Sequence, residues 1–239
     1  MFAELLIGVP VVGCIAPEAN WLAAIEDPHV PVKIAFAPTL GFATVDAEVA
    51  AACERAVGVL ESLGADVDVI DSVFDSDPGR QFVTMTAAAT LRTLRPFMEH
   101  PRWDEVDPVL RHFVDIAQST TAEQILQVFD TYHFMNLRLV ELFRSCRILV
   151  TPTCSGLAPF ADDMMGSVNG VKTPNWIQFT YPFNMTRSPA ATVPIAMSSN
   201  GLPIGLQLIG PQHGDLVVLR TAAALEAAID LDLLATLPE

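Results

Sequence analysis

Hydrophobic residues in the first third of the chain recur with two different periods, which predict strands and helices in turn. Short apolar runs bounded by turn residues predict strands at Val32–Ala37 and Ala65–Ile70. Between them, apolar residues at helical spacing predict a helix over Val45–Leu63, which Gly64 ends. A strand, a helix and another strand in this order indicate parallel strands joined by a right-handed crossover. The pattern therefore predicts an α/β fold.

The middle of the chain has mostly helical periodicity. Helices are predicted at Asp77–Glu99, Pro108–Gln118, Thr121–Arg144 and Pro174–Phe183, and a strand at Arg147–Val150. Thr120 or Thr121 can cap the longest of these helices, with Glu123 close behind. Leu157–Val171 has no clear period and is predicted to be a loop. Met1–Leu22 is predicted to hold part of a helix and a connecting segment.

The last quarter of the chain predicts a β-hairpin followed by one helix. Ala190–Met197 is a short apolar run, and Gly205–Gly210 is a second. Ser198, Ser199 and then Asn200-Gly201 separate them, and Asn-Gly adopts the positive φ of a tight turn at little cost. Asp215–Ile229 has helical spacing and closes the predicted fold.

The stretch from Phe179 to Pro211 resembles the C-terminal signature of the amidase signature family, whose members hydrolyse carbon–nitrogen bonds of amides. The family pattern is N-x-T-G-x-P-A…V-P…G-L-P-x-G-x-Q-x-I-G. It is matched here by Asn184, Thr186, Pro189, Ala190, Val193, Pro194, Gly201, Leu202, Pro203, Gly205, Gln207, Ile209 and Gly210. Arg187 stands where the family has glycine, which often holds a φ that arginine reaches only with strain.

Two further segments extend the resemblance over nearly the whole chain. Residues 40–65, LGFATVDAEVAAACERAVGVLESLGA, are similar to a segment at the same place in the family. Thr151-Pro152-Thr153 is similar to the T-P-T that follows a family strand. The resemblance implies the C-terminal portion of the family's fold, a mixed sheet covered by helices. It also implies that residues 1–239 form a single incomplete amidase-like domain without the N-terminal catalytic part.

The resemblance implies that the catalytic residues lie outside this chain. The family uses a serine nucleophile, activated by a lysine that acts through a second serine, and backbone amides that hold the oxyanion. These residues belong to the family's N-terminal half. Here Lys33 lies in a predicted strand and Lys172 in a loop, and no Gly-Gly-Ser-Ser stretch is present. Ser198-Ser199 is predicted to be part of the hairpin turn. The chain is therefore expected to contribute no catalytic residue and to be inactive alone.

Three residues before the hairpin are candidates for substrate binding. Helical spacing places Trp176 and Thr180 on one face, with Asn184 a turn further on, as an aromatic wall with polar anchors. The alternative is that Trp176 and Phe179 are core residues and that Asn184 ties the hairpin backbone. No Asp or Glu lies between Lys172 and Ala190 to hold a charged amino acid, which favours a less polar substrate.

Composition excludes several classes of partner. The net charge is −15 without a basic patch, so neither nucleic acid nor an anionic membrane surface is an expected partner. Hydrophobic residues make up 51% of the chain and charged residues 17%, against about 25% in an ordinary globular chain. Part of the surface is therefore expected to be covered, by a complementary chain or in a homodimer.

Metals, cofactors and targeting segments have no sequence support. The histidines lack ligand spacing and Asp162-Asp163 is too small a cluster, so no metal is expected. No dinucleotide fingerprint is present, so no cofactor is expected. The four cysteines are widely spaced and predict free thiols in a reducing cytoplasm. Glu4 and Pro10 interrupt the apolar start, which predicts neither a signal peptide nor a membrane span.

The function that best fits the sequence is the C-terminal region of an amidase-signature amidohydrolase, acting on a small-molecule amide once an N-terminal half completes it. Two alternatives remain open. One is a non-catalytic interaction protein or truncated remnant that binds a partner through an exposed sheet edge. The other is part of the A subunit of a tRNA-dependent amidotransferase. An independent serine hydrolase that uses Ser155, Ser188 or Ser199 has the least support.

Overall fold

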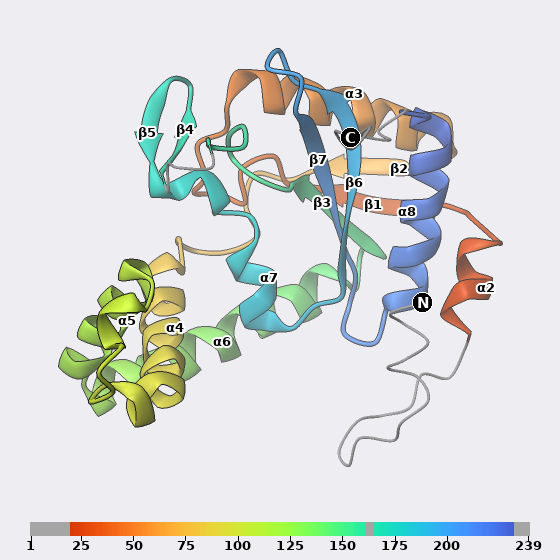
Figure 1. Ribbon diagram of the computed structural model, residues 1–239. Helices are drawn as coiled ribbons and strands as arrows, with labels where there is room; N and C mark the ends of the chain where they lie inside the picture. Colours follow the sequence, from red (N-terminus) through yellow and green to blue (C-terminus); the bar gives the residue numbers. More distant parts are fainter. Residues whose placement is uncertain (1–19, 161–164, 232–239) are drawn as a thin grey trace.

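A five-stranded mixed sheet forms the centre of the molecule (Figure 1). The computed structural model describes residues 20–160 and 165–231. The strands are β1 (Lys33–Phe36), β2 (Asp66–Val69), β3 (Ile148–Pro152), β6 (Ala190–Met197) and β7 (Pro203–Ile209), in the order β2-β1-β3-β7-β6. β1 pairs in parallel with β2 and β3, whereas β7 is antiparallel to β3 and β6. The predicted mixed α/β fold is confirmed.

Helices cover both faces of this sheet. Successive strand residues point to opposite sides, so each strand contributes side chains to both covered faces. Ile34 and Phe36 of β1 pack in the core beneath α3 (Ala47–Ser62) and α8 (Asp215–Ile229). Ala35, between them, belongs to a second core that also contains residues of α6 (Ala122–Leu142) and α7 (Tyr181–Thr186). None of the helices in the described ranges has both the length and the apolar character that crossing a membrane requires.

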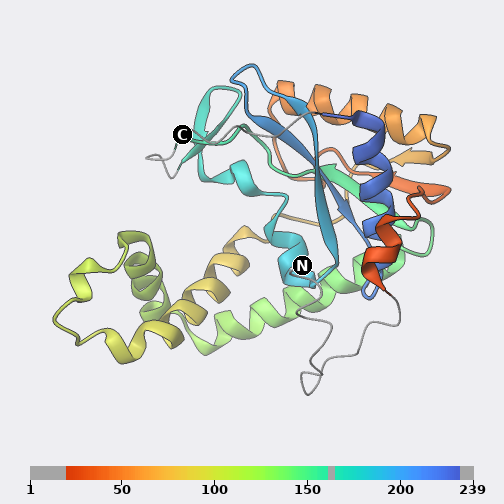
Figure 2. The same cartoon turned by 45° about the vertical axis from the view of Figure 1, so that its right-hand side comes forward.

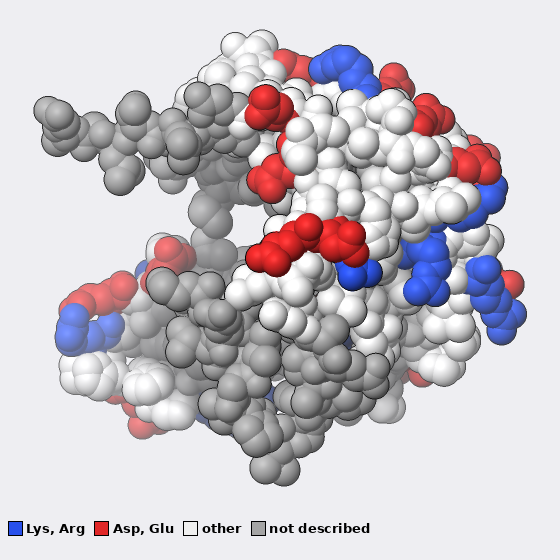
Figure 3. All heavy atoms as spheres, turned by 90° about the vertical axis from the view of Figure 1, so that its right-hand side faces the viewer, with Lys and Arg blue, Asp and Glu red and all other residues white. Residues whose placement is uncertain are grey.

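A short helix, α2 (Trp21–Ile25), packs beside α8 at the start of the described chain (Figure 2). Figure 3 views this side of the molecule, where acidic and basic side chains lie among uncharged ones. An ion pair of 3.2 Å joins Arg220 Nη2 of α8 to Asp27 Oδ2, just after α2. α2 overlaps the end of the segment Met1–Leu22, and the rest of the prediction for that segment lies outside the described residues.

The chain segment that connects β2 to β3 forms a helical arm, which projects away from the sheet (Figures 1 and 2). It consists of α4 (Gly79–Leu94), the 3₁₀ turns η1 (Arg95–Phe97) and η2 (Trp103–Glu105), α5 (Pro108–Ser119) and the first half of α6. The helix predicted over Asp77–Glu99 ends early, because Pro96 cannot donate the next helical hydrogen bond. The N-terminal cap of α6 is a capping box formed by Thr121 and Gln124. Gln124, and not Glu123, is therefore the residue that completes it.

The prediction of a loop over Leu157–Val171 was wrong in its second half. β4 (Gly166–Val168) and β5 (Val171–Thr173) form a hairpin there, turning through Asn169-Gly170 with φ values of 50° and 77°. Three-residue strands are too short to show a period. The backbone N–H of Asn169 donates to Asp46 Oδ2 over 2.7 Å, which fastens the hairpin to the start of α3. Asp162-Asp163 lies outside the described residues.

The helix predicted over Pro174–Phe183 is divided in two. A 3₁₀ turn, η3 (Pro174–Ile177), is followed by a break and then by α7. Pro182 has no N–H to donate to the carbonyl of Gln178, so one α-helical bond across the break is absent. The Thr180 backbone and hydroxyl both donate to the carbonyl of Ile177, over 3.1 and 3.0 Å, and tighten the chain there. The candidate substrate-binding residues therefore do not share one helical face.

Arg187 ends α7 in the left-handed conformation, with φ 55° and ψ 32°. This is a conformation that glycine adopts readily and that costs other residues free energy, so strain at Arg187 stays a prediction. Arg187→Gly is expected to raise the free energy of unfolding by about 0.5–1 kcal/mol, measured by urea unfolding. Arg187→Ala removes the same side chain but keeps the strain, so it should bring no gain. Equal gains in both variants would contradict this explanation.

Candidate functional site

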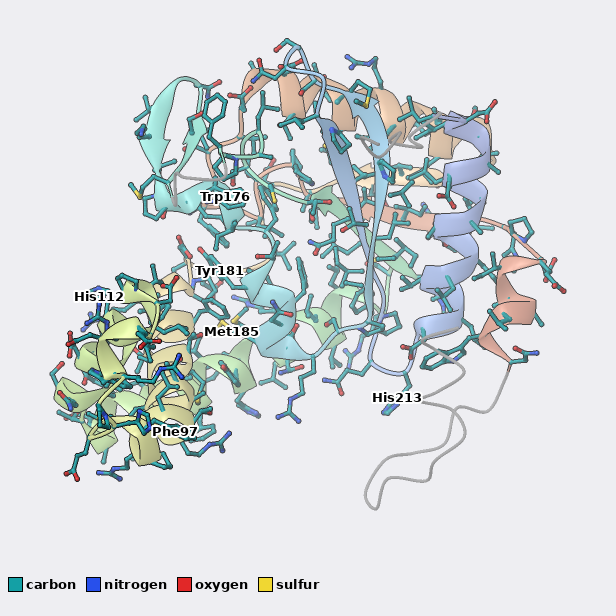
Figure 4. All side chains as sticks on the ribbon, in the orientation of Figure 1. Phe97, His112, Trp176, Tyr181, Met185 and His213 are labelled. Atoms are coloured by element: carbon teal, nitrogen blue, oxygen red, sulfur yellow. The ribbon has the colours of Figure 1, made fainter. Side chains whose placement is uncertain are left out.

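A polar cluster joins the arm to the segment formed by η3 and α7. The Tyr181 hydroxyl donates to Asp77 Oδ1 over 2.5 Å, and Gln178 Nε2 donates to Asp77 Oδ2 over 2.8 Å. The Gly79 backbone amide, at the start of α4, donates to Asp77 Oδ1 over 2.8 Å. Tyr181 and Gln178 are both buried, and Figure 4 shows Tyr181 between α7 and the arm. The carboxylate of Asp77 thus holds α4 against the segment that carries the predicted site.

The ring of Tyr181 completes this junction by stacking. It lies against Phe82 of α4, with ring centroids 5.2 Å apart and planes inclined by 21°. Burial, and next the hydrogen bond and charge of Asp77, raise the pKa of the Tyr181 phenol far above its ordinary value of 10.0. The phenol therefore stays protonated at neutral pH and acts as a hydrogen-bond donor.

The raised pKa of Tyr181 predicts a loss of stability in alkali. Above about pH 10 the unfolded chain releases the phenolic proton while the folded chain retains it, so the free energy of unfolding falls as pH rises. Urea midpoints between about pH 8 and about pH 11 should show a steeper decline for the native sequence than for Tyr181→Phe. Burial also raises the pKa of the Cys53 thiol to about 12 and of Cys146 and Cys154 to about 11, and both proteins share this contribution. Parallel declines would contradict the role of Tyr181.

An apolar cavity of about 450 Å³ opens beside the stacked rings, between α4, α5, α6 and α7. Its lining residues are Phe82, Met85, Thr86, Ala89, Thr90, Thr93, Leu94, Leu110, Tyr132, Asn184 and Met185. Figure 4 shows Met185 on the side of α7 that faces the arm. The volume is typical of small-molecule sites, which are mostly apolar with a few polar groups. The cavity can therefore hold an apolar group next to the amide of Asn184.

The three candidate substrate-binding residues lie in different surroundings. Asn184 is exposed and lines the apolar cavity, and within the described chain its side chain has no hydrogen bond. The alternative that Asn184 ties the hairpin backbone is therefore wrong. Trp176 lines a second cavity of about 220 Å³ beside the end of β3, the middle of β6 and the start of β7. It packs so closely over Gly166 that an added Cβ would lie 2.3 Å from the Trp176 ring. The hydroxyl of Thr180 is already bound to the backbone.

Several residues of the sequence signature hold this segment on the sheet. Gln207 is buried in β7, and its Nε2 donates to the carbonyl of Phe179 over 3.0 Å and to Thr151 Oγ1 over 3.2 Å. Thr186 Oγ1 donates to the carbonyl of Pro182 over 3.1 Å and steadies α7. A Cβ on Gly205 would lie 2.7 Å from the side chain of Thr192 and 2.8 Å from that of Thr153, so a larger residue would force these side chains to shift. These signature positions are structural.

Of the residues considered for catalysis by this chain alone, Ser199 and Lys33 interact with carboxylates, whereas the hydroxyl of Ser155 has no hydrogen-bond partner among the described residues. Ser199 donates to Glu48 through its amide and hydroxyl, over 2.5 and 2.9 Å, and so belongs to the hairpin turn as predicted. Lys33 forms ion pairs with Asp66 and Asp68 of the edge strand β2. Ser155 is fully buried, and its hydroxyl has no hydrogen-bond partner among the described residues. Within the described ranges, no three His, Cys, Asp or Glu residues converge on one point.

Comparisons with known proteins agree on one family. The family profile described as Amidase matches residues 10–219. The chain is 29% identical over 227 residues to an acylamidase of Rhodococcus erythropolis, covering 88% of this chain and 45% of that protein. It is 26% identical over 211 residues to a 6-aminohexanoate-cyclic-dimer hydrolase of a Pseudomonas species, covering 80% of this chain and 42% of that one.

Solved structures show the same fold. A bacterial aryl acylamidase of the amidase signature enzymes superimposes with a TM-score of 0.77 at 22% identity, over 90% of this chain and 47% of its own. A 6-aminohexanoate cyclic dimer hydrolase superimposes with a TM-score of 0.76, over 93% of this chain and 50% of its own. The chain thus spans about half the length of the proteins it matches.

Proposed function

Since the chain belongs to the amidase family, we propose that it is the C-terminal part of an amidase-signature amidohydrolase, which cleaves carbon–nitrogen bonds of carboxylic amides. The observation that carries the proposal is the contrast in coverage. The family profile matches residues 10–219, yet the chain spans only 45% of the acylamidase. Residues 1–239 then form one incomplete domain, which an N-terminal half completes.

In this proposal the Ser-Ser-Lys machinery lies in the other half, and the chain alone does not hydrolyse amides. A serine hydroxyl is a weak nucleophile unless a base removes its proton. Lys33, one of the two lysines in the sequence, pairs with Asp66 and Asp68 on the edge strand. Ser199 is engaged by Glu48 in the hairpin turn. These interactions of Lys33 and Ser199 support the proposal that the chain itself contains no serine activated by a lysine.

The contribution of this half is the wall that receives the substrate. The apolar cavity of about 450 Å³ fits an acyl chain or aryl group, and Asn184 offers an amide at its edge. Trp176 would form an aromatic wall at the second cavity. Thr180, whose hydroxyl donates to the carbonyl of Ile177, would position the segment between Trp176 and Asn184. Relatives named as acylamidase and fatty acid amide hydrolase support an amide substrate with an apolar group. No Asp or Glu lies between Lys172 and Ala190, which speaks against the amidotransferase alternative.

Hydrolysis of a panel of small aryl amides tests the proposal. The purified chain alone is expected to be inactive, and activity is expected when it is co-expressed with the N-terminal half of an acylamidase such as that of Rhodococcus erythropolis. Hydrolysis by the chain alone would overturn the proposal that the catalytic residues lie in the other half. Ser155, Ser188 and Ser199 would then be replaced in turn. A soluble, folded chain that stays inactive in both experiments would favour the non-catalytic interaction protein.

Ligand binding tests the cavity without requiring hydrolysis. An aryl amide should bind the chain alone, observed as NMR shift changes in α4 and α7 residues. Ala89→Trp places an indole in the cavity and should weaken this binding about 10-fold or more. Ala51→Trp makes the same change on the exposed side of α3 and should leave binding unchanged. Equal binding by both variants would remove the cavity from the proposed site.

A further inference from the structure

A further cavity, of about 530 Å³, lies between the end of α7 and the turn that leads from β7 into α8. We call it the Arg187 cavity, and Figure 4 shows His213, one of its residues, beside the end of α8 at which this helix begins. In contrast to the apolar cavity, most of its lining side chains are polar. The lining residues are Phe183, Asn184, Arg187, Ser188, Pro189, Gln212, His213 and Asp215.

The guanidinium of Arg187 is available to a ligand. Arg187 and His213 are both exposed, and within the described ranges neither side chain forms a hydrogen bond or an ion pair. Gln212, by contrast, is occupied, because its Nε2 donates to Asn136 Oδ1 over 3.0 Å and to the carbonyl of Thr186 over 3.1 Å. A guanidinium without a carboxylate partner can form charge-assisted hydrogen bonds with an anion from outside the chain.

This cation is a feature of the chain and not of the signature to which position 187 belongs. The family pattern has glycine there, whereas Arg187 holds a φ of 55° that costs residues other than glycine free energy. His213, with φ 63°, is a second left-handed residue beside the same cavity. Unfavourable backbone conformations of this kind occur preferentially at binding and catalytic sites. The backbone therefore supports a binding role for a cavity that the cation already suits to an anion.

Asn184 connects the Arg187 cavity to the apolar cavity, because it lines both. Arg187 follows three residues later, at the C-terminal cap of α7. Tyr132 lines the apolar cavity, and burial raises the pKa of its phenol, whereas the charge of Arg187 lowers it by a smaller amount. The guanidinium is therefore within electrostatic reach of the apolar cavity. One ligand can thus contact an apolar surface and a cation together.

We propose that the apolar cavity and Arg187 together bind a molecule with an aryl or alkyl group that ends in a carboxylate. The apolar group fills the cavity between α4, α5, α6 and α7, and the carboxylate extends past Asn184 to Arg187. The planar guanidinium offers a carboxylate two parallel hydrogen bonds. Asp215 repels an anion on the α8 side of the Arg187 cavity, so the carboxylate is placed on the α7 side. The inference rests on the proposed function in one respect, the role of the apolar cavity.

Calorimetric binding of 4-phenylbutyrate and 4-phenylbutanamide to the full chain tests the role of Arg187, because these ligands differ in charge and hardly in shape. At about 0.15 M salt the native chain should bind the acid about 10-fold more tightly than the amide. Arg187→Gln should weaken binding of the acid alone and abolish this difference, and Arg187→Lys should retain part of it. Arg55→Gln makes the same change on the exposed side of α3 and should retain all of it.

The variant Ala89→Trp tests whether both ligands use the apolar cavity, and it should weaken the binding of each. Equal binding of acid and amide by the native chain would overturn the role of Arg187, as would a preference for the acid that Arg187→Gln leaves intact. Binding of the acid that Ala89→Trp leaves unchanged would overturn the two-part site. If neither ligand binds, this inference and the role of the apolar cavity both fail, while hydrolysis by the co-expressed halves is still tested separately.

Two sources supply such a carboxylate: an amide substrate that carries one, and the acid that amide hydrolysis releases. With the co-expressed N-terminal half, a substrate role predicts that Arg187→Gln raises KM for succinanilate but not for its methyl ester. A product role predicts unchanged KM values and weaker inhibition by 4-phenylbutyrate. Either result supports the site. If KM and inhibition both stay unchanged, Arg187 binds no carboxylate in the completed enzyme and the proposal fails.

Discussion

Replacing Phe179 with alanine is expected to lower the free energy of unfolding by about 3–5 kcal/mol. Phe179 is fully buried in the core beneath α6 and α7, and its carbonyl accepts the hydrogen bond from Gln207. Removing the ring would leave a cavity at the point where the segment before α7 is fastened to the sheet. Surrounding side chains cannot close such a cavity completely, so both the lost transfer free energy and the cavity contribute.

Urea unfolding followed by circular dichroism measures this effect. Phe160→Ala makes the same chemical change at a side chain that is 82% exposed, and it should alter the free energy of unfolding by less than about 0.5 kcal/mol. If the two variants lost equal stability, Phe179 would not be the anchor of the segment.

Replacing Asp77 with alanine is expected to lower the free energy of unfolding by about 2–3 kcal/mol, because several donors lose a charged acceptor together. The hydroxyl of Tyr181 and the amide of Gln178 are on buried side chains, so water does not readily replace the carboxylate. Gly79, at the start of α4, loses its acceptor as well. Hydrogen exchange in α4 should therefore accelerate more than exchange in α3, since α4 depends on this junction.

Asp75→Ala provides the matched control two residues earlier. Asp75 is exposed and pairs with Arg138 over 2.6 Å, and an exposed pair contributes at most about 1 kcal/mol. Unchanged exchange in α4 after loss of Asp77 would show that packing alone holds the arm. A double replacement with Tyr181→Phe should be less destabilising than the sum of the two single replacements, because the residues share a hydrogen bond.

Local pattern was sufficient for most of the sheet and its covering helices. The predicted bounds of β6 and α8 agree with the structure at both ends, and β1, α3 and β2 lie within their predicted ranges. Gly64 has the positive φ of 96° that its place after a helix indicated, and Arg187, which stands where the family has glycine, has a left-handed conformation. These features depend on neighbours in the chain, and the sequence displays such neighbours directly.

The candidate site depended on contacts that no local pattern contains. Asp77 meets Gln178 and Tyr181 across 101 and 104 residues of sequence, and sequence reasoning missed it because no motif marks it. The apolar cavity was missed for the same reason, since four helices line it. The helical spacing of Trp176, Thr180 and Asn184 had no significance once the chain broke after η3.

The sequence by itself determined the strands of the central sheet, the helices α3 and α8 and the family, because each is encoded by residues close together. Only the tertiary structure decided which apolar positions are covered. Periodicity marks Leu126, Phe129, Leu137 and Val140 as apolar, but their exposure depends on what packs against α6. The placement of Asn184 beside an apolar cavity and of Trp176 at another was likewise decided by packing, because burial is a property of the assembled elements.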